Sequence, residues 1–434
     1  MKELYSKFGM SFVLIGLVLL LTLLTWSDQA PSPLSGAKSV ATQIKKLSLS
    51  SDAAVLIVHR AIPGEQEFAE NLKTELNGND VNIAGTVEGD MRQARLFMES
   101  RIQSGLQIDV IAVPVAVSKW LLFEDLASID AQLKSTELIS PKLTSGSTFL
   151  SADNLKNVFS QISIVAIMAI GMTMVIISGG IDLSVGSLTA FSAVFCCWLI
   201  DHFGGGMEAG AGSLVFFSLV SIIACCGIGL FNGFMVTKHR IPPFIMTLAM
   251  MLIARGFASI ISKGQTIQVN EEYNWLGTGA TLNIPNTVIL MAILFAIAYM
   301  VMNKMRYGRH LYAVGGNIEA AHLSGVSINK VLMVAYLVCG GLAGLGGIIL
   351  ASQFNSGAHT YGLMYELKVI ASVVVGGTSL SGGQGHVLGT LIGALIIAVI
   401  ENGMNLLGLD SYVQNVVLGF VILSAVWIDS HKKN

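Results

Sequence analysis

The stretch Gly179–Leu188, which reads GGIDLSVGSL, interrupts a long apolar sequence with two adjacent glycines and one aspartate. The uncharged run ISIVAIMAIGMTMVIIS precedes it, and the uncharged run TAFSAVFCCWLI follows it. A charged side chain at membrane depth is costly unless it is paired or hydrated. We therefore expect a helix break at Gly179 and Gly180, with Asp182 either capping the next helix or lining a transport pathway.

The composition of the whole chain is that of a membrane protein. Of its 434 residues, 53% are hydrophobic and 12% are charged, whereas soluble domains carry about 25% charged residues. The formal net charge of −2 provides no basic field, so we expect no nucleic-acid partner. Since a spanning helix needs about 20 mostly apolar residues, the uncharged runs predict an all-α polytopic membrane protein. The ten predicted spans are residues 9–26, 161–179, 183–201, 213–236, 243–262, 286–303, 330–352, 364–380, 385–402 and 412–428.

The first span is followed by a long segment of different composition. A cleaved signal peptide is the alternative for this span, but its apolar stretch is longer than the 7–15 residues of a signal core, and no A-x-A site follows Trp26. We therefore expect three parts. They are an N-terminal anchor at 1–27, an inserted α/β domain at 28–150, and the main transmembrane domain at 151–434.

Lysine and arginine residues in the short loops indicate the orientation of the chain, because such residues are enriched on the cytoplasmic side. With ten spans, all four basic groups lie on one side of the membrane. Both termini are then cytoplasmic, and residues 28–150 are extracytoplasmic. The four groups are Lys2 and Lys7, Lys238 and Arg240, Lys304 with Arg306 and Arg309, and Lys432 with Lys433.

The inserted segment alternates between strand-like and helix-like patterns. After a linker, DQAPSPLSGAKS, the strand-like stretches AAVLIVHR, VNIAGTV and IDVIAVPVA alternate with the helical patterns GEQEFAENLKTELNG, MRQARLFMESRIQSG and SKWLLFEDLASIDAQL. This βαβαβα order predicts a small parallel sheet. The stretch RQARLFMESRIQSGLQIDVIAVPVA resembles part of one lobe of periplasmic sugar-binding proteins. Docking, a scaffold without a ligand and sugar sensing all remain open as its role.

The pattern around Gly179 occurs a second time near the C-terminus. VVVGGTSLSGGQGHVLGTLIGA at 373–394 repeats the order of VIISGGIDLSVGSLTAFSA at 175–193, with a Gly-Gly pair, Leu-Ser and a helix of small residues. Two interrupted segments in two halves of a chain indicate an internal repeat with a pathway at its midplane. The predicted pathway and helix-break residues are Gly179, Gly180, Asp182, Ser184, Gly186, Gly376, Gly377, Ser381, Gly382 and Gly383.

The longest predicted cytoplasmic loop, residues 304–329, contains the sequence NIEAAHLSGV. It predicts a short helix that Asn317 caps and Gly325 ends. A short helix on a cytoplasmic face is a docking element for another protein; an ordinary solvated loop is the alternative.

Several stretches together resemble the permease subunits of ribose/galactose-type ABC sugar importers. They are NLKNVFSQISIVAIMAIGMTMVIISGGIDLSVGSLTA, GLFNGFMVTKHRIPPFIMTLAMMLIARG, YGRHLYAVGGNIEAAHLSGV, YELKVIASVVVGGTSLSGGQG and ENGMNLLGLDSYVQNVVLGFVILSAVWID. The resemblance covers about residues 150–429 and the first anchor. The long segment at 28–150 departs from the family pattern, which has a short loop there.

The resemblance implies a permease of the bacterial inner membrane for a monosaccharide similar to ribose, galactose or xylose. It implies a second permease copy in a homodimer or heterodimer, and a periplasmic sugar-binding protein that delivers the sugar. It also implies a cytoplasmic ABC ATPase that engages the loop. The residues expected to couple the ATPase are Gly315, Gly316, Asn317, Glu319, Ala320, Ala321, Ser324 and Gly325.

The chain itself carries no G-x-x-x-x-G-K-[ST] motif, so we expect ATP to bind the partner subunit. No catalytic, metal or cofactor pattern stands out. A sugar pathway needs polar side chains that bond hydroxyl groups, and the candidates are Gln161, Asn232, Gln353, Asn355 and Asn402. A permease for nucleosides or branched-chain amino acids is the alternative within transport. An ion-coupled carrier is less favoured, because Asp182, Arg255, Glu366, Lys368, Glu401 and Asp410 lie near the ends of predicted spans. A membrane-anchored sensor is the remaining alternative.

Overall fold

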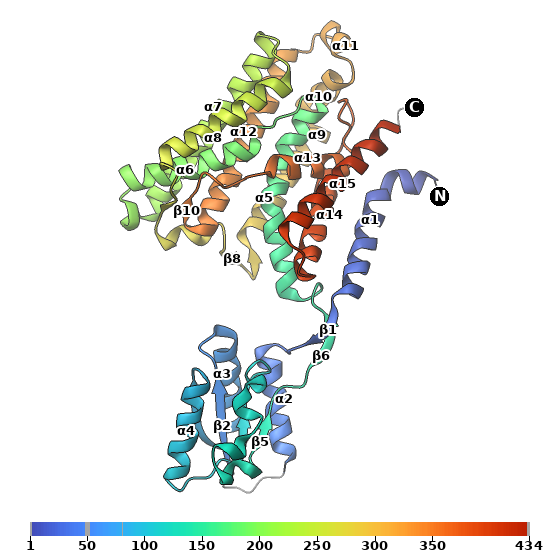
Figure 1. Cartoon of the computed structure of the whole chain (residues 1–434). Coiled ribbons are helices and arrows are strands. Elements are labelled where there is room, and N and C mark those ends of the chain that lie inside the picture. Colours follow the sequence, from blue (N-terminus) through green and yellow to red (C-terminus); the bar gives the residue numbers. More distant parts are fainter. Residues whose placement is uncertain (1, 48–52, 80, 432–434) are drawn as a thin grey trace. The chain divides into compact units, whose positions relative to one another are not determined.

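The computed structural model describes residues 2–47, 53–79 and 81–431. Lys432 and Lys433, which the orientation prediction uses, lie outside the described residues. The chain divides into two compact units (Figure 1). One combines Met1–Thr25 with Phe149–Asn434, and the other is Trp26–Thr148.

The first unit is helical (Figure 1). Its helices are α1 (Lys2–Leu24), α5 (Ala152–Ile177), α6 (Val185–Phe203), α7 (Ala211–Lys238), α8 (Pro243–Ser262), α9 (Asn286–Lys304), α10 (Arg306–Gly316), α11 (Ile318–Leu323), α12 (Ile328–Phe354), α13 (Tyr365–Val375), α14 (Val387–Leu406) and α15 (Ser411–His431). Two-residue strands pair in the connections, β7 (Ile267–Gln268) with β10 (Ser356–Gly357) and β8 (Ala280–Thr281) with β9 (Ile284–Pro285).

Seven helices among the described residues are long and apolar enough to cross a membrane. They are α5, α6, α7, α8, α9, α12 and α14, and shorter apolar helices occur at Gly9–Leu24 and Ser411–Trp427. The prediction of ten spans is therefore not reproduced, and the span at 364–380 is wrong. Its helix α13 has 11 residues, or about 16 Å at 1.5 Å per residue, which is half of a ~30 Å hydrocarbon core.

The core of the helical unit forms around α5 and α12. Of the most apolar 18-residue stretch of α5, 89% is buried inside the protein. Glycines allow α12 to approach its neighbours closely: a Cβ at Gly171 of α5 would lie 2.6 Å from Cys339 Cα, and one at Gly340 would lie 2.5 Å from Cys225 O of α7. Such close backbone contact is how small residues hold membrane helices together.

The second unit is a small α/β domain (Figure 1). Its parallel sheet has the order β3-β2-β4-β5, formed by β3 (Asn82–Glu88), β2 (Ala54–His59), β4 (Val110–Ala112) and β5 (Glu137–Ile139). Helices α2 (Pro33–Lys46) and α3 (Pro63–Asn77) pack on one face, and α4 (Met91–Gln103) packs on the other. An antiparallel pair, β1 (Trp26–Gln29) with β6 (Thr144–Ser147), joins the two ends of the unit.

Two predictions for this unit are wrong. The expected linker includes the start of α2, because Ser32 caps that helix by accepting a hydrogen bond from Ser35 N and Pro33 occupies its first position. The expected helix SKWLLFEDLASIDAQL is a series of 3₁₀ turns between Val117 and Ser135. Within it, Asp130 Oδ1 accepts from the nearby amide of Gln132, and such local bonds compete with a continuous helix.

Candidate functional site

The first helix break begins at the C-terminus of α5. Gly179 has a φ of +84°, which glycine adopts without a Cβ penalty. Gly179 N donates to Ile176 O at 2.9 Å, and Gly180 N donates to Val175 O at 2.9 Å. These bonds satisfy carbonyl groups that the end of a helix leaves free. The break predicted at Gly179 and Gly180 is therefore confirmed.

Asp182 lies fully buried in the turn between α5 and α6. Its Oδ1 accepts from Ser184 N at 2.9 Å and from Ser184 Oγ at 2.5 Å. Ser184 is itself the N-cap residue of α6, so Asp182 fixes the turn before the helix instead of capping an amide inside it. Asn232 Nδ2 of α7 donates to Ser184 Oγ at 3.2 Å, which ties this turn to the neighbouring helix.

The second break, after α13, ends its helix in the same way. Gly377 has a φ of +89°; its N–H donates to Val374 O at 2.9 Å, and Thr378 N donates to Val373 O at 3.2 Å. The left-handed residue is the second glycine of the pair Gly376–Gly377, whereas it is the first glycine of the other pair. Both copies of the repeated motif thus form a helix terminus, with a shift of one residue.

The two breaks meet each other and the end of α10. Gly383 N donates to Ile177 O at 2.8 Å. A Cβ at Gly315 would overlap Ile177 O and approach Gly383 N to 2.6 Å, and a Cβ at Gly382 would lie 2.9 Å from Gly315 O and 3.1 Å from Gly179 N. We call Ile177, Gly179, Gly315, Gly382 and Gly383 the glycine junction. Three segments far apart in the sequence are in direct backbone contact there.

A short helix follows the glycine junction. In α11, the Asn317 side chain accepts from Ala320 N at 3.0 Å as the N-cap, and Gly325 has a φ of +78° after the helix. The predicted helix with its cap and its stop is therefore confirmed. Ala321 is buried, whereas Ile318 and Leu323 are 49% and 88% exposed. The helix thus presents apolar side chains that nothing in the described chain covers.

The structure does not gather the five predicted sugar contacts into one site. Asn232 is buried against Ser184, and Asn402 forms a reciprocal amide pair with Asn154 of α5 at 3.0 and 2.8 Å. Asn355 ends α12 with a φ of +47°, and the backbone of Gln353 packs on Gly277. Gln161 differs from these four because it lines a cavity.

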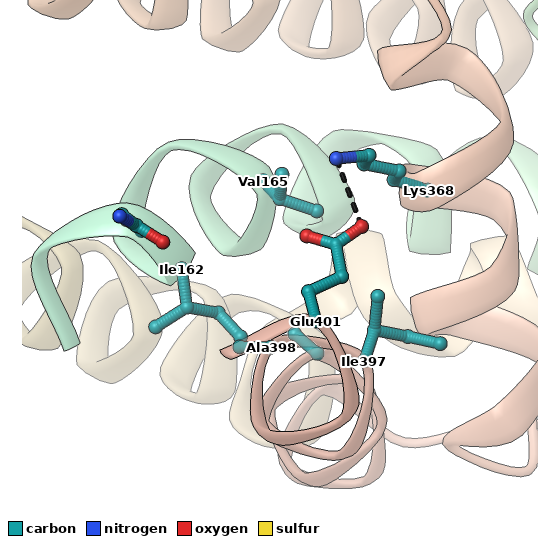
Figure 2. A pocket seen from close by; sticks show the side chains of 8 residues that line it. Ile162, Val165, Lys368, Ile397, Ala398 and Glu401 are labelled. Carbon is teal, nitrogen blue, oxygen red and sulfur yellow. Dashed lines mark ion pairs between the residues drawn. The ribbon is translucent and has the colours of Figure 1, made fainter. Parts of the chain in front are cut away.

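Two charged residues that the sequence places near the ends of predicted spans also line that cavity. Lys368 Nζ of α13 and Glu401 Oε1 of α14 form an ion pair of 2.8 Å (Figure 2), and both residues line this cavity together with Gln161. The remaining lining residues are Ile162, Val165, Ala394, Ile397 and Ala398. A lysine and a glutamate of opposite charge in two successive apolar segments were the signal that could have identified them.

Comparison with known proteins assigns most of the helical unit. Residues 154–426 match the family model described as branched-chain amino acid transport system / permease component. The ribose import permease protein RbsC of Escherichia coli (strain K12) is 41% identical over 305 residues, covering 68% of this chain and 91% of that protein. The RbsC of Bacillus subtilis (strain 168) is 41% identical over 288 residues, covering 66% of this chain and 87% of that protein.

A xylose permease matches as well. The xylose transport system permease protein XylH of Haemophilus influenzae is 34% identical over 352 residues, covering 66% of this chain and 91% of that protein. No solved structure matches the chain. The family match begins at Asn154, so the α/β domain lies outside it.

Proposed function

The chain belongs to the permease family that matches residues 154–426, and we propose that within this family it is the membrane-spanning subunit of an ABC importer for a monosaccharide similar to ribose or xylose. The observation that carries this proposal is the 41% identity to a ribose import permease across 91% of that protein's length. The xylose permease supports the same class of cargo. These ribose and xylose permeases therefore favour a sugar as the cargo over a nucleoside or a branched-chain amino acid.

The proposed complex contains other subunits. Because the chain has no phosphate-binding G-x-x-x-x-G-K-[ST] motif, a cytoplasmic ABC ATPase supplies the energy. A periplasmic binding protein delivers the sugar, and a second permease copy, identical or related, completes the pathway. The chain resides in the bacterial inner membrane with both termini cytoplasmic and residues 28–150 extracytoplasmic.

The α11 helix is the proposed contact with the ATPase. Its exposed side chains, Ile318 and Leu323, offer the apolar surface that a partner groove would cover. Because Gly315 lies three residues before Ile318 and touches the backbone of both helix breaks, a displacement of α11 is passed to Ile177 and Gly383. The glycine junction thereby links ATP-driven motion to the broken helices.

For the α/β domain we propose a docking role on the side where the sugar arrives. Two observations support this proposal. The α/β domain lies outside the family match, and it has hydrophobic clusters of its own, so it is an addition to the helical unit that transports the sugar. A direct role in sugar capture is the second candidate.

An uptake assay with a panel of cargo tests the proposed function. The chain is reconstituted in vesicles with the ATPase and binding protein encoded beside it, and radiolabelled ribose, xylose, galactose, leucine and adenosine are offered separately. We expect ATP-dependent uptake of a monosaccharide. Uptake of leucine or adenosine in its place would contradict the proposed cargo.

A further inference from the structure

An ion pair joins two apolar helices, α13 and α14, of the helical unit. Lys368 and Glu401 lie in the first turn of α13 and near the end of α14, and their side chains are 25% and 27% exposed. The Lys368 ammonium also lies 5.6 Å from the centre of the Tyr365 ring. Ionisable residues within membrane segments are rare and mark pathways for cargo. The pair therefore requires a functional explanation.

The pair lines a cavity between the two broken-helix segments. Gln161 comes from α5, which ends at the first break; Lys368 comes from α13, which ends at the second break; and Glu401 comes from α14. In Figure 2 the Glu401 carboxylate points toward the Lys368 ammonium across the space that Val165 and Ile397 border. The cavity volume of ≈ 30 Å³ holds water but is too small for a sugar. A sugar thus fits only when the helices that line the cavity, α5, α13 and α14, move apart.

We propose that Lys368, Glu401 and Gln161 form a contact site for hydroxyl groups of the transported sugar, an inference that rests on the proposed function. An ammonium donates up to three hydrogen bonds, a carboxylate accepts several, and an amide does both. Hydroxyl groups donate and accept, so a polyol complements all three side chains. Hydrogen bonds to charged groups are about twice as strong as neutral ones.

The charges of the pair favour a neutral cargo over an ion. One positive and one negative side chain line the cavity together with an uncharged amide, so the site has no net charge. A bound ion would leave an uncompensated charge in apolar surroundings, whereas a neutral polyol leaves none. When the site is closed, Lys368 and Glu401 satisfy each other; when it opens, hydroxyl groups replace that contact.

Uptake of deoxy sugars by single variants tests the site. We compare Glu401→Gln and Lys368→Gln with the unaltered chain in the complete complex, using the parent sugar and each of its monodeoxy analogues. Loss of one charged hydrogen bond is expected to lower uptake of the parent sugar about tenfold to hundredfold. The analogue that lacks the contacted hydroxyl should lose little further, because its bond is already absent.

A matched control and a second variant complete the test. Asp201→Asn removes the charge of an exposed carboxylate in the helical unit, whose Oδ2 lies 3.4 Å from His202 Nδ1, and should change no ratio between sugars. If the single variants do not fold, K368E/E401K restores the pair with its charges exchanged, and we expect it to change the ranking of the deoxy analogues.

The contact site would be overturned if a single variant lowered uptake of the parent sugar and of every analogue by the same factor. An unchanged ranking of the deoxy analogues in K368E/E401K would also overturn it. Failure of the unaltered complex to take up any sugar would instead reject the proposed function.

Discussion

Replacement of Gly315 by alanine tests whether transport needs the close backbone contact at the glycine junction. A Cβ there would overlap Ile177 O, and a backbone atom cannot move away as a flexible side chain can. We expect Gly315→Ala to destabilise the helical unit by about 1–3 kcal/mol and to reduce sugar uptake per ATP hydrolysed. Transport and ATP hydrolysis measured in the same vesicles give this ratio.

A glycine in open space provides the control for Gly315. Gly227 of α7 has nothing within 4 Å of its added Cβ, so Gly227→Ala should leave transport unchanged. The role given to the glycine junction would be refuted if Gly227→Ala lowered sugar uptake per ATP hydrolysed, or if Gly315→Ala left that ratio unchanged.

Asp182 tests the buried turn at the first break. Replacement by alanine leaves Ser184 N and Oγ without their acceptor, at a cost of about 1–3 kcal/mol for a buried group. We expect Asp182→Ala to lower the melting temperature and the uptake, whereas Asp182→Asn keeps an acceptor oxygen and retains more of both. Thermal unfolding of the purified variants measures the difference.

Asp201 serves as the comparison for Asp182, because its side chain is 52% exposed and Asp201→Ala should be neutral. Normal melting and normal uptake in Asp182→Ala would show that the turn holds without this carboxylate.

The short helix α11 presents Leu323, which is 88% exposed. Leu323→Ser removes apolar surface without disturbing a core, so we expect unchanged thermal stability and weaker binding of the ATPase subunit. Co-purification of the two subunits and sugar-stimulated ATP hydrolysis are the measurements.

Leu282 is the matched control for Leu323, since it is 90% exposed in the turn between β8 and β9. Leu282→Ser should leave ATPase binding intact. Equal ATPase binding by Leu323→Ser and the unaltered chain would exclude this side chain from the contact.

The elements also differ in how far the sequence predicts them. The ends of α5 and α11 follow from local chemistry, because glycines at Gly179 and Gly325 adopt left-handed conformations and Asn317 caps its helix. The length of α13 does not follow from apolar composition, since Val373–Val375 continues into residues that are apolar or small but not helical. The helix ends instead where Gly377 adopts a left-handed conformation with a φ of +89°.

The ion pair was missed for a similar reason. Sequence position places Lys368 and Glu401 near the ends of predicted spans, but only packing brings α13 and α14 together and aligns the two side chains across one cavity. The predicted contacts Asn232 and Asn402 have the right chemistry, yet tertiary hydrogen bonds with Ser184 and Asn154 occupy them.

Of the two units of the molecule, the α/β domain has its own core on both faces of its sheet. The two ends of the domain pair with each other, with Trp26 opposite Ser147, so a fragment cut out at these ends keeps the pairing. We expect a fragment of residues 26–148 to fold alone and to unfold cooperatively, as followed by circular dichroism. Leu72 is fully buried in it, and Leu72→Asp should abolish the transition; a fragment without any transition would show that the domain depends on the helical unit.

If this chain moves a monosaccharide with energy from a separate ATPase, sugar uptake must depend on that ATPase. ATP-dependent uptake of radiolabelled ribose is the measurement, in vesicles that contain the chain, its ATPase and its binding protein, and in vesicles that lack each partner in turn. We expect uptake only when ATP and the ATPase are both present, with the binding protein required for delivery. Equal uptake without the ATPase would contradict this expectation.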